Sequence, residues 1–203
     1  MKSTAKSTAR DSIREAAIGL FAEKGYAATT TREICRRAGV TKPVLYYHFE
    51  SKERLYSELA LDASNESRKQ LLLASQREGS VRERLVAMMA ASFALTMREP
   101  KLSTMFLRMV FPAGEAEPGI DCVGLGLEYV SLIAGVVSEG IRRGELQGRA
   151  QEVAQVLTGV HLIWAMSYVL TGGPKLDRNL ARRMVDLVVD GCGNPSGRAG
   201  KRI

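Results

Sequence analysis

The sequence contains few of the residues that build metal centres and disulfide frameworks. Three cysteines and two histidines occur in 203 residues, and no two cysteines form a Cys-x-x-Cys pair. Zinc sites and disulfide-stapled folds depend on such spacing. We therefore expect no metal site, and we interpret Cys35, Cys122 and Cys192 as reduced, buried thiols of a cytosolic protein.

Sequence motifs of catalysis are missing as well. The chain has no Gly-rich phosphate-binding loop, no nucleophile motif and no metal-ligand spacing. An enzyme would have to work with Glu128, His161 and a cysteine, which share no such motif. We therefore expect a protein that is not an enzyme and carries no cofactor.

Segments that direct a chain to or through a membrane are expected to be absent too. Residues 1–12 (MKSTAKSTARDS) lack an apolar core and predict a loose basic arm rather than a signal peptide. From Val153 to Pro174 there is no Asp, Glu, Lys or Arg, so this stretch could span a bilayer by length. It contains polar residues such as Gln155 and His161, however, and no basic cluster flanks it. We expect a buried helix of a soluble bundle or dimer in a cytoplasmic protein, with no membrane partner.

Basic charge is present, and it is concentrated near the N-terminus. The net charge is +7; residues 1–52 hold ten Lys/Arg and five Asp/Glu, whereas residues 53–189 hold sixteen of each. A local excess of this kind is typical of a surface that binds phosphate. Hydrophobic residues make up 45% of the chain, which is enough to bury a core in an ordinary globular protein.

The most informative stretch is residues 30–52, TTREICRRAGVTKPVLYYHFESK. Thr30 followed by Glu33 predicts a capping box at the start of a short helix, and Gly39 predicts the turn after it. Thr41 predicts the cap of a second short helix. Two short helices joined by a tight turn, the second carrying basic and aromatic side chains, are typical of a helix-turn-helix that enters a DNA groove.

Helical patterns cover the rest of the chain. Apolar residues at helical spacing from Ile13 to Phe21 predict an amphipathic helix that ends at Gly25. Ser51 predicts the cap of a fourth helix, which runs to about Ala74 and links the helix-turn-helix to the later helices. These later helices are expected at residues 80–98, 100–110, 121–143, 150–171 and 177–191.

Several runs of sequence agree with one family at once. They are LFAEKGY (20–26), TTREI (30–34), AGV (38–40) and LYYHFESKERL (45–55), with a weaker echo in EGIRRGEL (139–146). Through them, residues 10–56 resemble the N-terminal domain of the TetR family of bacterial transcriptional regulators. The remainder of the chain agrees with that family only in length and helix count.

The resemblance implies a set of DNA contacts on and around the two short helices. Thr31 would meet a phosphate and Arg32 a guanine edge, while Lys52 would act as a phosphate clamp. Base edges would be contacted from the second helix by Lys42, Pro43, Val44 and Tyr47. Phosphate or sugar contacts, which set register rather than sequence, would come from Tyr46 and His48.

Other roles are open for some of these residues. Tyr46 could be partly a packing residue, and His48 could be a hydrogen-bonding residue at the helix end. Arg36 and Arg37 could simply solvate the outer face of the first short helix.

The larger part of the chain is rich in methionine and aromatic residues. Such side chains line adaptable apolar pockets, although at helical spacing most are expected to be core. Since the resemblance implies a small, largely apolar effector, we select candidate contacts for it. They are Met89, Phe93, Met97, Met105, Phe106, Met109, Leu125, Glu128, Tyr129, His161, Trp164 and Tyr168.

Two of these candidates carry a polar group into an apolar stretch. Glu128 interrupts an otherwise uncharged run, so its carboxylate would either anchor a ligand or lie on a solvated helix face. His161 lies on an apolar helix face, where we expect a hydrogen-bonded core histidine, with a ligand contact or pH switch as alternatives.

The helix expected at 150–171 has two apolar faces and therefore needs two partners. In the TetR family the last two helices pair with those of a second subunit as a four-helix bundle. The resemblance therefore implies a homodimer, and either face of this helix could point to the ligand. Candidate interface residues are Val156, Val160, Ile163, Leu180, Met184, Leu187 and Val188.

Together these features predict an all-α protein of about nine helices. Residues 1–52 would form a three-helix DNA-binding domain, residues 53–193 a ligand-binding and dimerisation domain, and residues 194–203 a disordered basic tail, with a mobile loop at Pro112–Gly119. The implied function is a ligand-responsive regulator, by default a repressor, that binds a palindromic operator of double-stranded DNA and is released by the effector. The alternative is a DNA-binding protein of the same fold that acts through protein partners rather than through transcription.

Overall fold

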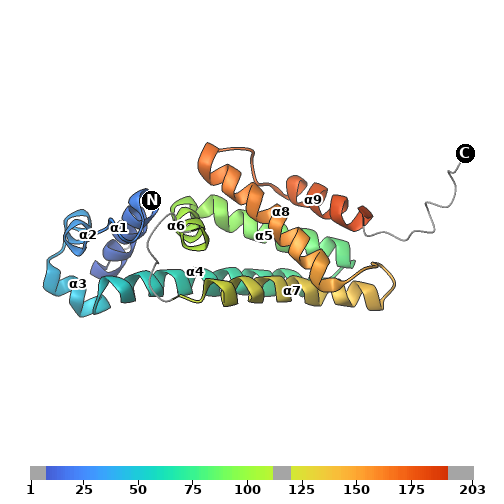
Figure 1. Cartoon of the computed structure of the whole chain (residues 1–203), viewed down its shortest axis with the longest axis horizontal. Helices are drawn as coiled ribbons and strands as arrows, with labels where there is room; N and C mark the ends of the chain where they lie inside the picture. Colours follow the sequence, from blue (N-terminus) through green and yellow to red (C-terminus); the bar gives the residue numbers. More distant parts are fainter. Residues whose placement is uncertain (1–7, 112–119, 192–203) are drawn as a thin grey trace, which may run out of the picture. The chain divides into compact units, whose positions relative to one another are not determined.

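The computed structural model describes residues 8–111 and 120–191, which contain nine α-helices and no strand (Figure 1). The predicted all-α fold is therefore confirmed. Residues 1–7 of the predicted arm, the predicted loop at 112–119 and the predicted tail at 194–203 lie outside the described residues.

The chain forms two compact units, which do not follow each other simply along the sequence. The N-terminal unit contains Met1–Asn65 and Glu99–Cys122, and the C-terminal unit contains Glu66–Arg98 and Val123–Ile203. A segment from the middle of the chain thus packs with the helix-turn-helix.

Four helices and the first part of a fifth build the N-terminal unit. They are α1 (Ala9–Lys24), α2 (Thr31–Ala38), α3 (Lys42–Phe49), the start of α4 (Lys52–Ser75) and α6 (Pro100–Val110). Their apolar faces share one core, in which Ile13, Ile34 and Leu45 are completely buried. Helix α1 supplies the stripe predicted from its spacing, so the first three helices form around it.

The ends of the short helices are set by local hydrogen bonds. The Thr30 hydroxyl accepts from the backbone N–H of Glu33 at 3.3 Å, and the Glu33 carboxylate accepts from the backbone N–H of Thr30 at 3.0 Å. Gly39 ends α2 in the left-handed region, with φ of 68°. Both predictions are confirmed, as is the Ser51 cap, whose hydroxyl accepts from the backbone N–H of Arg54. Thr41 occupies the capping position of α3, but its side chain makes no capping hydrogen bond.

Helix α6 belongs to the core of the N-terminal unit. Met105 and Met109 are buried there, and Phe106 packs against the same cluster. Arg108 fastens α6 to α1 by donating from Nε to the carbonyl oxygen of Ala22 at 3.0 Å. The three apolar residues selected as effector contacts on α6 therefore pack with the helix-turn-helix, because α6 docks against α1.

The C-terminal unit consists of the rest of α4 and four more helices. They are α5 (Val81–Arg98), α7 (Cys122–Arg142), α8 (Ala150–Thr171) and α9 (Arg178–Gly191), each within one or two residues of its predicted range. Helix α9 packs against both α5 and α8, which also contact each other, and the three helices lie together in Figure 1. Arg82 of α5 reinforces this packing through ion pairs to Asp186 and Asp190 of α9, both at 2.6 Å.

Helices α7 and α8 are the most apolar of the chain. By length and composition alone, Val123–Arg142 and Ala150–Thr171 could cross a membrane. Both helices also supply buried residues to the core of the C-terminal unit, among them Val137 and Leu157. A core helix passes the same test of length and composition, so the finding is weak evidence for a membrane span.

Candidate nucleic-acid interface and ligand site

Helix α3 is attached to its unit by one face only. Leu45 and Phe49, four residues apart, are buried in the core with exposed fractions of 0% and 2%. A helix of two turns anchored at i and i+4 must present its opposite face outward. The sequence of α3 therefore determines which of its side chains are available to another molecule.

The outward face of α3 is basic and aromatic. Lys42, Pro43, Tyr46 and Tyr47 are exposed, and 84% of the surface of Tyr47 is accessible. Two exposed tyrosine rings beside an exposed lysine form one surface that another molecule can contact. All four are DNA contacts that the resemblance implies, and the structure brings them together on one face of α3.

The remaining predicted contacts of α3 are less free. Val44 is half-buried and packs against the core of the unit, so only part of its side chain can reach DNA. His48 is half-buried, and its ring meets that of Tyr47 edge-on, with centroids 5.1 Å apart. His48 is therefore placed to support Tyr47 as well as to contact a phosphate.

Helix α2 presents its own basic residues beside the turn. Thr31 is half-buried at the first position of α2, and Arg32 is exposed next to it. Arg37 is instead held by Glu23 of α1 at 2.8 Å, and this hydrogen bond raises the pKa of Arg37. Arg37 is thus engaged within the unit, whereas Arg32 is available to a ligand.

Lys52 has a role inside the unit that the sequence did not suggest. Its ammonium group donates to the carbonyl oxygens of Tyr26 and Thr29 at 2.9 and 2.8 Å, and it lies 3.9 Å from the centroid of the Tyr26 ring. Partial burial lowers the pKa of Lys52. Lys52 therefore fastens the connection between α1 and α2, and one of its three N–H donors remains for a phosphate.

The candidate effector contacts fall into two groups. Those in the core of the C-terminal unit, or packed against it, are Met89, Phe93, Met97, Tyr129, Trp164 and Tyr168. His161 contacts this group through ring stacking, and Leu125 is half-buried on α7. Those on α6 belong to the N-terminal unit. Only the first group can therefore form a shared site within the C-terminal unit.

His161 differs from the expected hydrogen-bonded core histidine. Its ring stacks on Phe93 and Tyr129, with centroids 5.0 and 5.9 Å away. Its Nδ1 atom is buried and has no hydrogen-bond partner among the described residues. Burial lowers the pKa of His161 to about 4, so the ring is neutral near pH 7. The prediction of a hydrogen-bonded histidine is wrong for this atom, because apolar rings from α5 and α7 cover it.

Glu128 lies on the surface of α7. Its carboxylate pairs with Arg68 of α4 at 2.6 Å, and about half of each side chain is exposed. Of the two alternatives, the solvated helix face therefore describes Glu128 better than a buried ligand anchor does.

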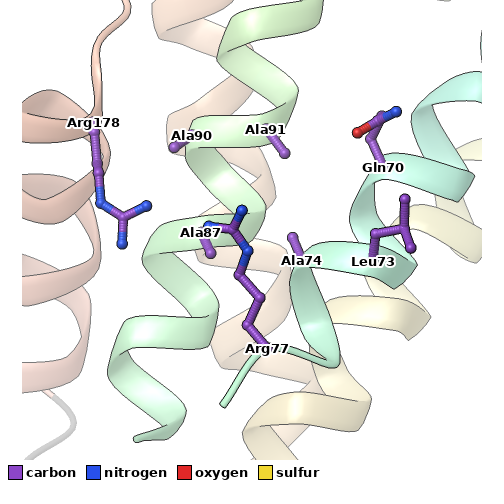
Figure 2. Close-up of a pocket in the computed structure, with 8 residues that line it drawn as sticks. All are labelled: Gln70, Leu73, Ala74, Arg77, Ala87, Ala90, Ala91 and Arg178. Atoms are coloured by element: carbon purple, nitrogen blue, oxygen red, sulfur yellow. The ribbon is translucent and has the colours of Figure 1, made fainter. Parts of the chain in front are cut away.

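A groove opens on the C-terminal unit at a place that the sequence did not indicate. Figure 2 shows it along α4 and α5, with Arg178 at the start of α9. Its volume is about 320 Å³, and it is lined by Gln70, Leu73, Ala74, Arg77, Ala87, Ala90, Ala91 and Arg178. None of the predicted effector contacts lines it.

Large apolar side chains remain exposed along α8 and α9. On α8 they recur every seven residues at Val156, Ile163 and Leu170, with exposed fractions of 50%, 59% and 72%, and on α9 Leu187 is 78% exposed. Val160 and Val188 are half-buried, packed against the core of the unit. The residues of the predicted dimer interface that instead face the core are Leu180 and Met184.

The described residues are helical, and the second helix of the helix-turn-helix presents a basic and aromatic face. These features are typical of DNA-binding helix-turn-helix proteins. Comparison with known proteins narrows this class. Residues 13–59 match the family model described as bacterial regulatory proteins, tetR family. Residues 13–59 therefore carry the N-terminal domain of the TetR family, and the predicted resemblance is confirmed for this part of the chain.

Curated relatives agree with this placement. Over 49 residues the chain is 45% identical to the biofilm operon icaADBC HTH-type negative transcriptional regulator IcaR of Staphylococcus aureus (strain Newman). That match spans 24% of this chain and only 26% of IcaR. The chain is also 25% identical to the HTH-type transcriptional repressor KstR2 of Rhodococcus jostii (strain RHA1) over 193 residues, 94% of each chain.

A solved structure shows the same fold over nearly the whole chain. The transcriptional regulator FadR of Bacillus subtilis, in complex with stearoyl-CoA, superposes with a TM-score of 0.76 at 20% identity. The superposition covers 90% of this chain and 98% of FadR. At this identity the likeness shows the fold alone.

Proposed function

We propose that the protein is a transcriptional repressor that binds a palindromic operator as a homodimer and is released by a small, largely apolar effector. The observation that carries this proposal is the exposed face of α3, where Lys42, Pro43, Tyr46 and Tyr47 stand free of the core. The proposed setting is the cytoplasm, where the operator is accessible.

Sequence would be read from two short helices. Lys42 and Arg32 suit the acceptor edge of guanine, while Pro43 and the exposed part of Val44 suit thymine methyl groups. Tyr47 would reach a base edge. Contacts to the phosphate backbone, which fix the register, are proposed for Thr31, Tyr46, His48 and Lys52.

A second copy of the chain would cover the apolar stripe on α8 and α9. Val156, Ile163, Leu170 and Leu187 lie exposed there, and burying them against the same residues of a partner removes apolar surface from water. A symmetric dimer carries two recognition helices, which suits half-sites about 34–36 Å apart. This is why a palindromic operator is proposed.

Release would follow from linkage between two binding sites. An effector bound in the C-terminal unit weakens DNA binding by the factor by which DNA weakens effector binding. The apolar cluster around Phe93 and Tyr129 supports an apolar effector. The stearoyl-CoA bound to FadR supports a ligand with a long apolar portion, and the names of IcaR and KstR2 support repression.

A binding titration tests the central proposal. The purified protein is titrated against DNA from just upstream of its own gene, beside a scrambled duplex, at several salt concentrations. We expect a preference of about 10³ or more for the native fragment. Equal and steeply salt-dependent binding to both duplexes would contradict a repressor of its own promoter and favour a protein that binds only the DNA backbone.

A further inference from the structure

His161 carries a buried polar atom that the chain leaves unpaired. Its Nδ1 has no hydrogen-bond partner in the part of the chain that the structure describes. Buried polar atoms are nearly always hydrogen-bonded, because leaving one unpaired destabilises the folded state. A group from outside the chain that paired with Nδ1 would therefore gain binding free energy.

Hydroxyl groups on the two helices that carry Phe93 and Tyr129 are paired within the chain. The Tyr129 hydroxyl and the Ser92 hydroxyl share a hydrogen bond of 2.9 Å, and the Thr96 hydroxyl donates to the Ser92 carbonyl oxygen at 3.3 Å. The first bond links α5 to α7 and helps to hold Tyr129 beside the imidazole, whereas the second lies within α5. Among the described residues, Nδ1 of His161 is the buried side-chain polar atom that has no hydrogen-bond partner.

The surroundings of the imidazole favour an uncharged molecule. The rings of Phe93 and Tyr129 both lie at 26° to the imidazole, and Phe93 is completely buried. The pKa of His161 falls through burial, without a contribution from a charged neighbour, so the ring stays neutral near pH 7. A charged ligand group would lose its hydration on entering this stack of rings.

We propose that His161, Phe93 and Tyr129 form the binding site of an uncharged, apolar molecule that carries a hydroxyl group, with Nδ1 of His161 as the hydrogen-bonding anchor. A hydroxyl can both donate and accept, so it pairs with Nδ1 whichever ring nitrogen holds the proton. The apolar portion would pack against the two rings. This inference rests on the proposed function, because it names the chemistry of the effector.

The chain offers a direct spectroscopic test, since it contains only two histidines, His48 and His161. The full-length protein with ¹⁵N-labelled histidine is titrated with p-cresol and, separately, with p-xylene, in which a methyl group replaces the hydroxyl. We expect p-cresol to shift the Nδ1 resonance of His161 and to leave those of His48 in place. A p-cresol titration that moves only His48, or neither histidine, would overturn the proposal.

Replacing His161 by phenylalanine keeps a flat ring and removes the nitrogen. For His161→Phe we expect p-cresol to bind about 5- to 10-fold more weakly in calorimetry, because one hydrogen bond is lost. The affinity for p-xylene should stay the same. The matched control His48→Phe should bind p-cresol as the original protein does. Equal affinity of His161→Phe for p-cresol would refute the anchor.

The melting temperature of His161→Phe separates an anchor from a structural histidine. Since Nδ1 gains nothing from the chain, the variant should melt at or above the temperature of the original protein. A clearly lower melting temperature would show that Nδ1 is already satisfied within the fold, which overturns the proposal.

Operator titration distinguishes failure of this inference from failure of the proposed function. A protein that binds its operator specifically but shows no response of His161 to p-cresol loses only the effector site. A protein that binds p-cresol at His161 but shows no operator preference retains the site and loses its role as a repressor.

Discussion

Single side chains near the helix-turn-helix divide into those free to meet DNA and those engaged within the unit. Lys42 is exposed at the first position of α3. Arg37 and Lys52, by contrast, bind Glu23 and two backbone carbonyl groups. Cations of equal formal charge therefore differ in whether they are available to bind DNA. Their contacts within the unit, which the sequence does not reveal, make this difference.

Removing a free cation from α3 should change specificity. Replacing Lys42 by alanine is expected to weaken operator binding by about 1–3 kcal/mol and to relax the preference at one base pair. A set of operators mutated one base pair at a time measures this. The matched control Lys69→Ala removes the same charge from an exposed site on α4 and should leave the preference intact. Equal losses of Lys42→Ala on all duplexes would contradict base reading.

Removing the engaged cation should change stability as well as affinity. Lys52→Ala deletes two charge-assisted hydrogen bonds and a contact with the Tyr26 ring, so we expect it to lower the free energy of unfolding by about 1–2 kcal/mol. If its third donor binds a phosphate, the slope of affinity against salt should also fall by about one ion.

Urea unfolding and salt titrations measure the two effects of Lys52→Ala separately. Arg54→Ala is the control, because Arg54 is exposed and forms only a 3.9 Å pair with Glu50. It should change the free energy of unfolding by less than about 0.5 kcal/mol. A fall in stability with an unchanged salt slope would mean that Lys52 only fastens the connection between α1 and α2 and does not bind a phosphate.

Helix α2 shows how a short element depends on its ends. It has eight residues and buries only Ile34 and Cys35, which is little apolar surface for an independent helix. The capping box of Thr30 and Glu33 and the left-handed Gly39 supply the remaining stabilisation locally. Lys24 of α1 also binds Glu33, at 2.6 Å, and so ties the start of α2 to the preceding helix.

The carboxylate of Glu33 should make stability depend on acid pH. The Lys24 ammonium and the Thr30 hydroxyl and N–H lower the pKa of Glu33 to about 2, from 4.5. A carboxyl with a lowered pKa in the folded state stabilises fully above pH 4.5, and this contribution disappears as pH falls from 4.5 to 2.

Replacing Glu33 by glutamine removes this titration. The variant should be less stable than the original protein at pH 7, and the difference should shrink through pH 4 and vanish near pH 2. Urea unfolding at these pH values measures it. Glu15→Gln, at an exposed position of α1, should show no comparable change. A difference that is independent of pH would mean that the charge of Glu33 does not matter.

For the whole molecule, the exposed apolar residues of α8 and α9 predict association of two copies. Ile163→Glu places a charge in the centre of the stripe and should shift the protein from dimer to monomer, as measured by analytical ultracentrifugation. Ala94→Glu, at an exposed position of α5, should leave the assembly unchanged. A dimer of unchanged strength in Ile163→Glu would place the interface elsewhere.

The sequence alone determined the helices, their ends and the helix-turn-helix, because these depend on spacing and capping within a few residues. The apolar spacing around Ile13, the box at Thr30 and the turn at Gly39 all appear as expected. Side chains on α3 could be assigned for the same reason, since Leu45 and Phe49 decide which face is buried.

The tertiary structure alone decided what depends on contacts between distant parts of the chain. In the structure, Met105 and Met109 pack in the core that contains the helix-turn-helix. Leu180, a candidate for the dimer interface, packs in the core of the C-terminal unit. The tertiary structure also left Nδ1 of His161 without a partner among the described residues. Helical spacing predicts that a side chain is buried. It does not identify the residues that cover this side chain, because they belong to other helices.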